Sequence, residues 1–169
     1  MSQQSVRSLI EQLSDRNGVV RERSRYTLVL IGSPAVPALL ELLKSPTKRT
    51  RWEAAKALSA IAEPSSIPAL VGLLSDPQSD IRWLGAVGLT RVGPRAIPQV
   101  LHALIEKPDS VNIRRGAHHV FHDIGRKNPV FQEIMAPLMN ALGDTDPTSA
   151  LPPKAHEALN EIRALQEGA

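Results

Sequence analysis

A repeat of about 31 residues runs through this chain. Three apolar segments, at 35–46, 66–77 and 96–108, follow a similar pattern that includes an early proline. These prolines are Pro37, Pro68 and Pro98, which are 31 and 30 residues apart. An arginine recurs in the segment after each of them, at Arg51, Arg82 and Arg114. A period of this length predicts stacked copies of one supersecondary unit.

Each repeat contains two segments with helical periodicity. In the third unit, Ile67, Leu70 and Leu74 recur at intervals of three and four residues, and no strand-like alternation accompanies them. The early proline suits the first turn of a helix, where its missing N–H has no partner. Glycines stand where left-handed C-caps are expected, at Gly32, Gly93 and Gly125. The sequence therefore predicts an all-α fold.

The pattern extends more weakly toward both ends of the chain. VRSLIEQLSD precedes VRERSRYTLVLIG at the front, and MAPLMNALGDTDP precedes PKAHEALNEIRAL at the back. Because one helix pair cannot bury its apolar stripe alone, we expect neighbouring pairs to stack. We predict a single repeat domain over 1–169, an α-solenoid with a right-handed superhelix and about five helix pairs. The five units lie at about 5–32, 33–63, 64–93, 94–125 and 128–165.

The unit PALxxLLxDPxxxIRWxxAxxLxxVG resembles the bacterial HEAT repeat, in the short form called HEAT-like or phycobilisome-lyase-like. The resemblance covers about residues 5–165. It implies that an aspartate of the turn and an arginine of the second helix form a ladder between repeats. The residues that it assigns to this structural ladder are Asp15, Arg21, Arg51, Asp76, Arg82 and Arg114. Ser45 and Lys107 depart from the aspartate position, which puts the ladder in doubt there.

Composition and motifs argue against several classes of function. The chain has no cysteine, which excludes a thiol nucleophile, a disulfide scaffold and a cysteine-ligated metal. No P-loop, nucleophile elbow or dinucleotide-binding motif is present, so we expect a non-enzymatic protein without a cofactor. No stretch approaches the roughly 18 apolar residues that cross a bilayer, and the N-terminus lacks a signal-peptide pattern. We expect a cytoplasmic protein with no membrane partner.

The second helices of a helix-pair solenoid usually line its concave, binding face. Trp52 and Trp83 occupy one column of that face, one repeat apart. Two interpretations stay open: the rings form a two-aromatic anchor for a partner, or each ring lies flat across the groove between repeats. The residues that we predict to contact a partner protein are Trp52, Trp83, Lys56, Arg91, Arg115, His119 and Asp123.

The segment HHVFHD, at 118–123, gathers histidines on one predicted helix. His118 and His122 are four residues apart, the spacing that puts two imidazoles on one helix face for zinc. A metal site formed by His118, His119 and His122 is only a weak candidate, because no third ligand from elsewhere is identifiable. His156 falls in the column of His118, one unit on. We expect His118 to face inward as a core histidine.

Charge is uneven along the chain. Residues 1–60 hold ten Lys and Arg against five Asp and Glu, whereas residues 125–169 hold four against six. A basic half can bind phosphates or steer an acidic partner.

We therefore keep three functions open. The first is a protein–protein scaffold, which we favour. The second, implied by the resemblance, is a phycobilin lyase-type or chaperone-like subunit acting on a phycobiliprotein. The third is a nucleic-acid-binding protein, as in HEAT-like alkylpurine glycosylases.

Overall fold

The computed structural model describes residues 3–143 and 146–167, and in this part of the chain the regular structure is helical. The α-helices are α1 (Gln3–Gln12), α2 (Gly18–Ile31), α3 (Val36–Leu42), α4 (Lys48–Ile61), α5 (Ile67–Leu73), α6 (Ser79–Val92), α7 (Ile97–Glu106), α8 (Val111–Gly125), α9 (Pro129–Ala141) and α10 (Pro147–Glu167). Short 3₁₀ helices precede three of them: η1 (Ser33–Ala35), η2 (Pro64–Ser66) and η3 (Gly93–Ala96). The all-α expectation is confirmed.

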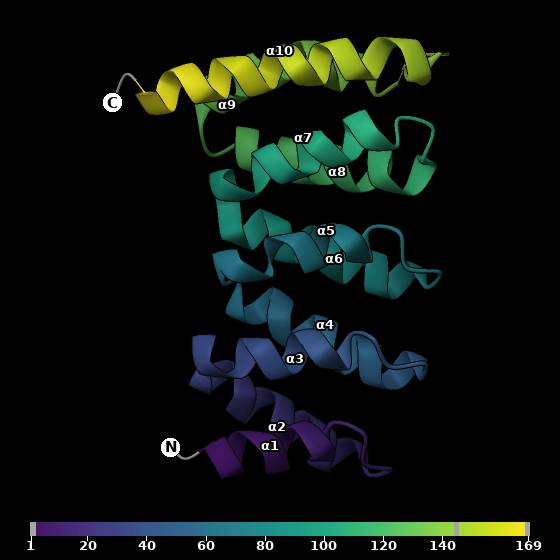
Figure 1. Ribbon diagram of the computed structural model, residues 1–169, viewed down its shortest axis with the longest axis vertical. Coiled ribbons are helices and arrows are strands. Elements are labelled where there is room, and N and C mark those ends of the chain that lie inside the picture. Colours follow the sequence, from purple (N-terminus) through teal and green to yellow (C-terminus); the bar gives the residue numbers. More distant parts are fainter. Residues whose placement is uncertain (1–2, 144–145, 168–169) are drawn as a thin grey trace.

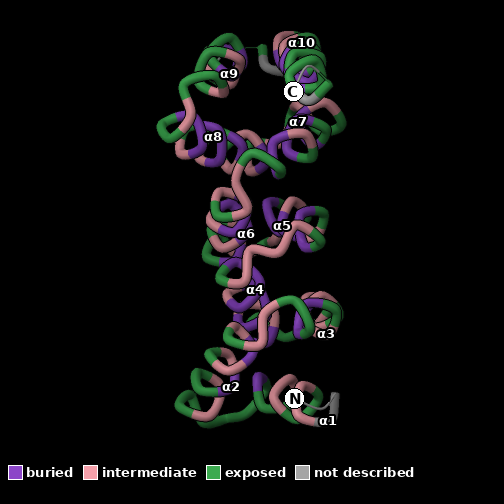
Figure 2. The backbone as a smooth tube through the Cα atoms, turned by 90° about the vertical axis from the view of Figure 1, so that its left-hand side faces the viewer, coloured by how far each residue is buried: buried purple, intermediate pink, exposed green. Residues whose placement is uncertain are grey.

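The helices form antiparallel pairs that stack in chain order (Figure 1). The second helices of the pairs, α2, α4, α6 and α8, pack on one another, and the first helices lie beside them in a parallel layer (Figure 2). Leucine, isoleucine and alanine side chains fill the space between the layers in one continuous core. The chain is therefore a helical-repeat solenoid, as the period predicts.

The ends of the helices follow the sequence signals. Pro37, Pro68 and Pro98 each lie in the first turn of a first helix. Gly32 and Gly93 have φ of 72° and 82° and end α2 and α6. The prediction that Gly125 is a C-cap is wrong, since it lies buried inside the last turn of α8 and Arg126 follows in helical conformation.

The last pair breaks the order of the repeat. Helix α9 packs on α8, and α10 packs on α7 and α9, so the layers of the two helices are exchanged relative to the earlier units (Figure 2). Every earlier second helix is followed by a 3₁₀ helix that leads into the next first helix. Only residues 126–128 separate α8 from α9, so the chain turns straight back on α8. The expectation that His156 of α10 continues the column of His118 is wrong for this reason.

Within the described residues, no helix combines the length and apolar character needed to span a bilayer.

Candidate functional site

Two neighbouring cavities open on the face formed by α2, α4, α6 and α8. The larger, of about 460 Å³, lies over α2, α4 and α6, and the smaller, of about 210 Å³, lies between α6 and α8. Trp83 lines both of them. We call the two cavities together the Trp83 groove. The backbones of α4 and α6 are set back from those of α2 and α8 on this side (Figure 2).

Trp83 is an exposed aromatic side chain at the centre of this groove. Its side chain is 55% exposed, although helix α6 packs against α4 on one side and against α8 on the other. Its ring lies beside that of His119 from the next unit, with 4.5 Å between the centroids and 41° between the planes. His119 therefore holds the indole from one side and leaves the other side open to the groove.

Trp52 is arranged differently, although it shares the sequence column of Trp83. Its ring is half-buried and packs against the core. The Lys56 ammonium lies 4.5 Å from the ring centroid, and the Arg25 guanidinium lies 5.6 Å from it. These two cation–π contacts cover the ring. Of the two alternatives for the tryptophans, the covered arrangement describes Trp52 and the exposed one describes Trp83.

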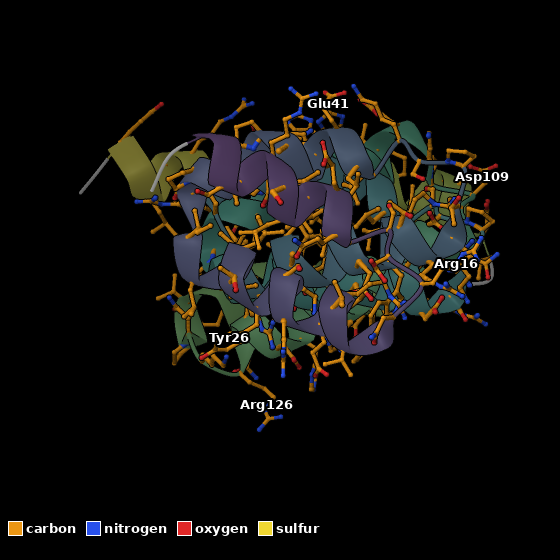
Figure 3. All side chains as sticks on the ribbon, turned by 90° about the horizontal axis from the view of Figure 1, so that it is seen from below. Arg16, Tyr26, Glu41, Asp109 and Arg126 are labelled. Atoms are coloured by element: carbon orange, nitrogen blue, oxygen red, sulfur yellow. The ribbon has the colours of Figure 1, made fainter. Side chains whose placement is uncertain are left out.

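Two further apolar side chains project beside the groove. Tyr26, which lines the larger cavity, is 64% exposed, and Leu30 is 68% exposed one turn later on α2. An end-on view shows Tyr26 and Arg126 on one side of the stack and Glu41 on the opposite side (Figure 3). The sequence analysis did not select Tyr26 or Leu30 as partner-binding residues. Their signal was the repeat register, in which Tyr26 aligns with Lys56 and Leu30 with Arg91.

Cations border the groove. Arg91 donates from Nη1 to the backbone oxygen of Ser59 at 3.1 Å, which fixes it across α4 and α6. Arg115 is exposed and lines the smaller cavity together with Arg82 and His119. No carboxylate lines that smaller cavity in the described chain. Glu22 lines the larger cavity, so it is the smaller cavity of the groove that favours a partner surface with negative charge.

A buried carboxylate stands behind the larger cavity. Glu53 of α4 is 4% exposed and accepts hydrogen bonds from Nε of Arg21, at 3.1 Å, and from Nη1 of Arg25. Both arginines come from α2 of the preceding unit. Since Arg25 also covers Trp52, this cluster links two units and fixes the wall of the groove.

Each of the first four units has an arginine early in its second helix, and we call Arg21, Arg51, Arg82 and Arg114 the turn arginines. They share a contact that the sequence analysis missed. Each donates from Nη1 to backbone oxygens five or six residues earlier, in the turn of its own unit. The oxygens six residues earlier belong to Asp15, Ser45, Asp76 and Pro108. Pro108, rather than Lys107, is thus the residue that aligns with the turn aspartates.

Among the described residues, one ion pair joins two members of the predicted ladder. Arg51 donates from Nε to Asp76 at 3.1 Å, across the boundary between two units. Arg21 finds its carboxylate at Glu53 instead, because Ser45 stands where the next aspartate would be. For Arg82 and Arg114, the described residues supply no ion pair.

Asp123 faces two of the clustered histidines. His122 Nδ1 lies 3.2 Å from Asp123 Oδ1, and His119 Nε2 lies 3.8 Å from Oδ2. The hydrogen bond from His122, followed by the charge of His119, holds the pKa of Asp123 below its ordinary value. Asp123 therefore lies close to the His119 imidazole that packs on Trp83.

The expectation that His118 faces inward is wrong, because His118 is exposed. Its ring lies nearly parallel to that of His122, with centroids 6.2 Å apart, on the outer face of α8. Among the described residues, no three side chains of His, Cys, Asp or Glu come together as a metal site requires. The i, i+4 spacing aligned two rings without bringing a third ligand from another helix.

Acidic partners compensate much of the basic half of the chain. Lys48 lies 3.1 Å from Asp80, and Lys44 lies 2.8 Å from Glu41. Burial raises the pKa of Asp80, but the hydrogen bond and charge of Lys48 outweigh it, so the pKa is lowered overall. Together with the pairs of the turn arginines, these contacts leave fewer free cations for phosphates than the sequence count suggests.

Comparison with known proteins supports the fold assignment. Residues 6–89 match the family model described as HEAT repeats. A solved chain of the complex of CpcE and CpcF of phycocyanin lyase from Nostoc sp. PCC7120 superposes with a TM-score of 0.59 at 20% identity, over 93% of this chain and 99% of that one. Two engineered proteins, 20% and 23% identical, cover 94% of this chain and 79% and 81% of their own, each with a TM-score of 0.48. No curated protein matches this chain.

The repeat pattern, the stacked pairs and the matched family model agree. The chain is a helical-repeat solenoid whose residues 6–89 match the family model of HEAT repeats.

Proposed function

We propose that this protein is a non-enzymatic scaffold that binds a partner protein in the Trp83 groove. The observation that carries the proposal is the exposed indole of Trp83 at the junction of two cavities. An exposed tryptophan flanked by arginines has the composition of an interface hot spot. Tyr26 and Leu30 extend the apolar surface along the same face, and Arg91 and Arg115 supply positive charge at its border.

Rigidity supports the same function. His119 and Asp123 hold one side of the groove, and the cluster of Glu53 with Arg21 and Arg25 holds the other. A pre-organised surface loses little conformational entropy when a partner binds. Side chains that hydrogen-bond one another across two units therefore suit docking better than a deformable surface.

Affinity capture from native extract, followed by binding measurements with the captured partner, tests this function. We expect Trp83→Ala to weaken binding by about 2 kcal/mol or more while helicity is retained. Trp52→Ala is the matched control for binding. Because Arg25 and Lys56 cover its ring, this substitution should mainly lower the free energy of unfolding rather than the affinity for the partner. If Trp83→Ala binds the partner as tightly as the unchanged protein, the groove is not the docking surface.

A second candidate is a subunit of a phycobilin lyase-type pair. It is favoured by the superposition on a chain of the CpcE–CpcF complex, which extends over nearly all of both chains. In that case the groove would meet a phycobiliprotein or the other subunit. The test mixes phycocyanobilin and an apo-phycobiliprotein with the purified protein, alone and together with the partner captured from native extract. A shifted bilin absorption band supports this role, and an unchanged spectrum in both mixtures removes it.

Nucleic-acid binding is the least supported of the three functions. Arg21, Arg25, Arg51, Lys44 and Lys48 are all paired with carboxylates. A phosphate-binding surface must present unpaired cations and lose affinity steeply with salt. We therefore expect duplex DNA to bind only weakly at low salt, and tight binding that falls steeply with salt would favour this function instead.

A further inference from the structure

Three of the turn arginines can be compared at the boundary that each shares with the next unit. Arg21 and Arg51 use Nη1 for their own turn and have a second set of N–H groups for a carboxylate of the next unit. Arg21 donates from Nε to Glu53, and Arg51 donates from Nε and Nη2 to Asp76. Each guanidinium therefore connects its own turn to an acidic group of its neighbour.

Arg82 meets a different neighbour. The two acids have defined positions relative to the turn arginine of their own unit: Glu53 follows Arg51 by two residues, and Asp76 precedes Arg82 by six. The corresponding positions around Arg114 are Gly116 and Pro108, neither of which carries an acid. Arg82 donates from Nη1 to the backbone oxygens of Asp76 and Pro77, at 2.8 and 3.1 Å. Its Nε and Nη2 groups have no carboxylate among the described residues.

The smaller cavity of the Trp83 groove opens at this place. Arg82 and Arg115 line it together, and Gly116 lines it without a side chain. A Cβ atom at Gly116 would come within 2.6 Å of Cδ2 of Leu74, so the Leu74 side chain occupies the space next to Gly116. Trp83 and His119 form an aromatic wall beside the two guanidinium groups.

We propose that a carboxylate side chain of the partner protein binds to Arg82 and Arg115 in this cavity. The partner's Asp or Glu takes the place of the acid that Glu53 and Asp76 supply at the two preceding boundaries. A guanidinium presents a planar fork that matches a carboxylate through two parallel hydrogen bonds. This inference rests on the proposed function, because it names the group that the partner brings to the Trp83 groove.

Titration with short blocked peptides tests the carboxylate directly. The probes are acetyl-Ala-Glu-Ala-amide, its matched Gln peptide, and inorganic phosphate, observed through the arginine Nε–H and tryptophan indole signals in ¹H–¹⁵N spectra of the full chain. We expect saturable shifts of the Arg82, Arg115 and Trp83 signals with the Glu peptide and not with the Gln peptide, whether or not phosphate also binds the two guanidinium groups. Equal shifts with the Gln peptide, no shift, or a response to phosphate only would overturn the proposal.

The substitution Pro108→Asp supplies the missing acid within the chain. In this variant the Arg82 Nε–H signal should move toward the position of Arg51, which is paired with Asp76, and the Glu peptide should bind about tenfold more weakly or worse. Arg115→Gln should also weaken binding, and it keeps the test valid if Pro108→Asp does not fold. Arg95→Gln removes the same charge outside the cavity and should leave peptide binding unchanged. Undiminished peptide binding in folded Pro108→Asp or in Arg115→Gln would contradict the proposal.

The two proposals fail in different ways. If the partner binds Pro108→Asp and Arg115→Gln normally but is lost with Trp83→Ala, the groove is the docking surface and the carboxylate contact is wrong. If Trp83→Ala also binds normally, the proposed function itself is wrong.

Discussion

At the scale of single residues, what matters in this chain is which cations have partners. Arg21 and Arg25 share Glu53, whereas Arg82 and Arg115 face a cavity that is lined by no carboxylate among the residues the structure describes. The sequence predicted the recurrence of the arginines, because spacing alone reveals it. It did not predict their partners, because Ser45 and Pro108 stand where an acid of the next unit would be, and spacing alone does not show that Glu53 pairs with Arg21 instead.

The buried carboxylate of Glu53 gives a stability prediction. Glu53→Gln should lower the free energy of unfolding by about 3 kcal/mol, since it leaves two largely buried guanidinium groups without their counter-charge. The matched control is Glu41→Gln, which removes an exposed pair with Lys44 and should change stability by no more than about 0.5 kcal/mol. Urea denaturation of both variants measures the difference. Equal effects would mean that the cluster does not hold the units together.

Ala62 gives a backbone prediction. It ends α4 with φ of 52°, where Gly32 and Gly93 end the neighbouring second helices. Ala62→Gly should stabilise the protein by about 0.5–1 kcal/mol, because glycine adopts positive φ without a steric penalty. Ala60→Gly, inside the same helix, should destabilise it by a similar amount. Thermal unfolding that ranks the two variants in the opposite order would contradict this.

The lowered pKa of Asp123 gives a prediction about pH. Because the folded value lies below the ordinary one, the charged carboxylate contributes stability above the ordinary pKa, and this contribution is lost as pH falls through the folded pKa, below about pH 4. His122→Gln removes the first cause of the shift, so the pKa of Asp123 should rise toward its ordinary value. NMR titration of the side-chain carboxyl carbon measures both values. An unchanged midpoint in the variant would show that His122 is not the cause.

At the scale of helices, the sequence predicted most of the elements from α1 to α8, because apolar spacing marks them and a proline marks the first turn of α3, α5 and α7. It did not predict the exchanged layers of α9 and α10. Both helices carry an apolar stripe, and a stripe indicates that a helix is buried without indicating which neighbour buries it. The short connection at 126–128 was the available signal, since the earlier connections contain an additional 3₁₀ turn. The same connection explains why Gly125 is inside a helix.

The close approach of α5 and α6 is testable at this scale. A Cβ at Gly85 would lie 2.8 Å from the backbone oxygen of Leu70. Gly85→Ala should therefore destabilise the protein by about 1–3 kcal/mol, because the two helices must separate. Gly72→Ala, where no atom lies within 4 Å of the added Cβ, should stabilise α5 by about 0.5–1 kcal/mol. Chemical denaturation of the pair checks the contrast, and a tolerated Gly85→Ala would refute the close packing.

At the scale of the whole molecule, the stack positions residues from successive units on one face. Tyr26, Lys56, Trp83 and Arg115 come from four different helices, and only the regular superposition of α2, α4, α6 and α8 brings them to one groove. The sequence register predicted this face and five of the groove's side chains: Trp83, Lys56, Arg91, Arg115 and His119. Exposure could not be predicted from the register, because Trp52 and Trp83 share a column and differ only in the side chains around them.

Quenching of tryptophan fluorescence tests this account most directly, because its central claim is that one exposed indole lies in a positively charged groove. In Trp52→Phe, the remaining Trp83 emission should be quenched strongly by iodide and weakly by caesium, since Arg82 and Arg115 attract the anion. In Trp83→Phe, the emission of the covered Trp52 should resist both ions. Equal quenching of Trp83 by the two ions, or a Trp52 more accessible than Trp83, would contradict the account.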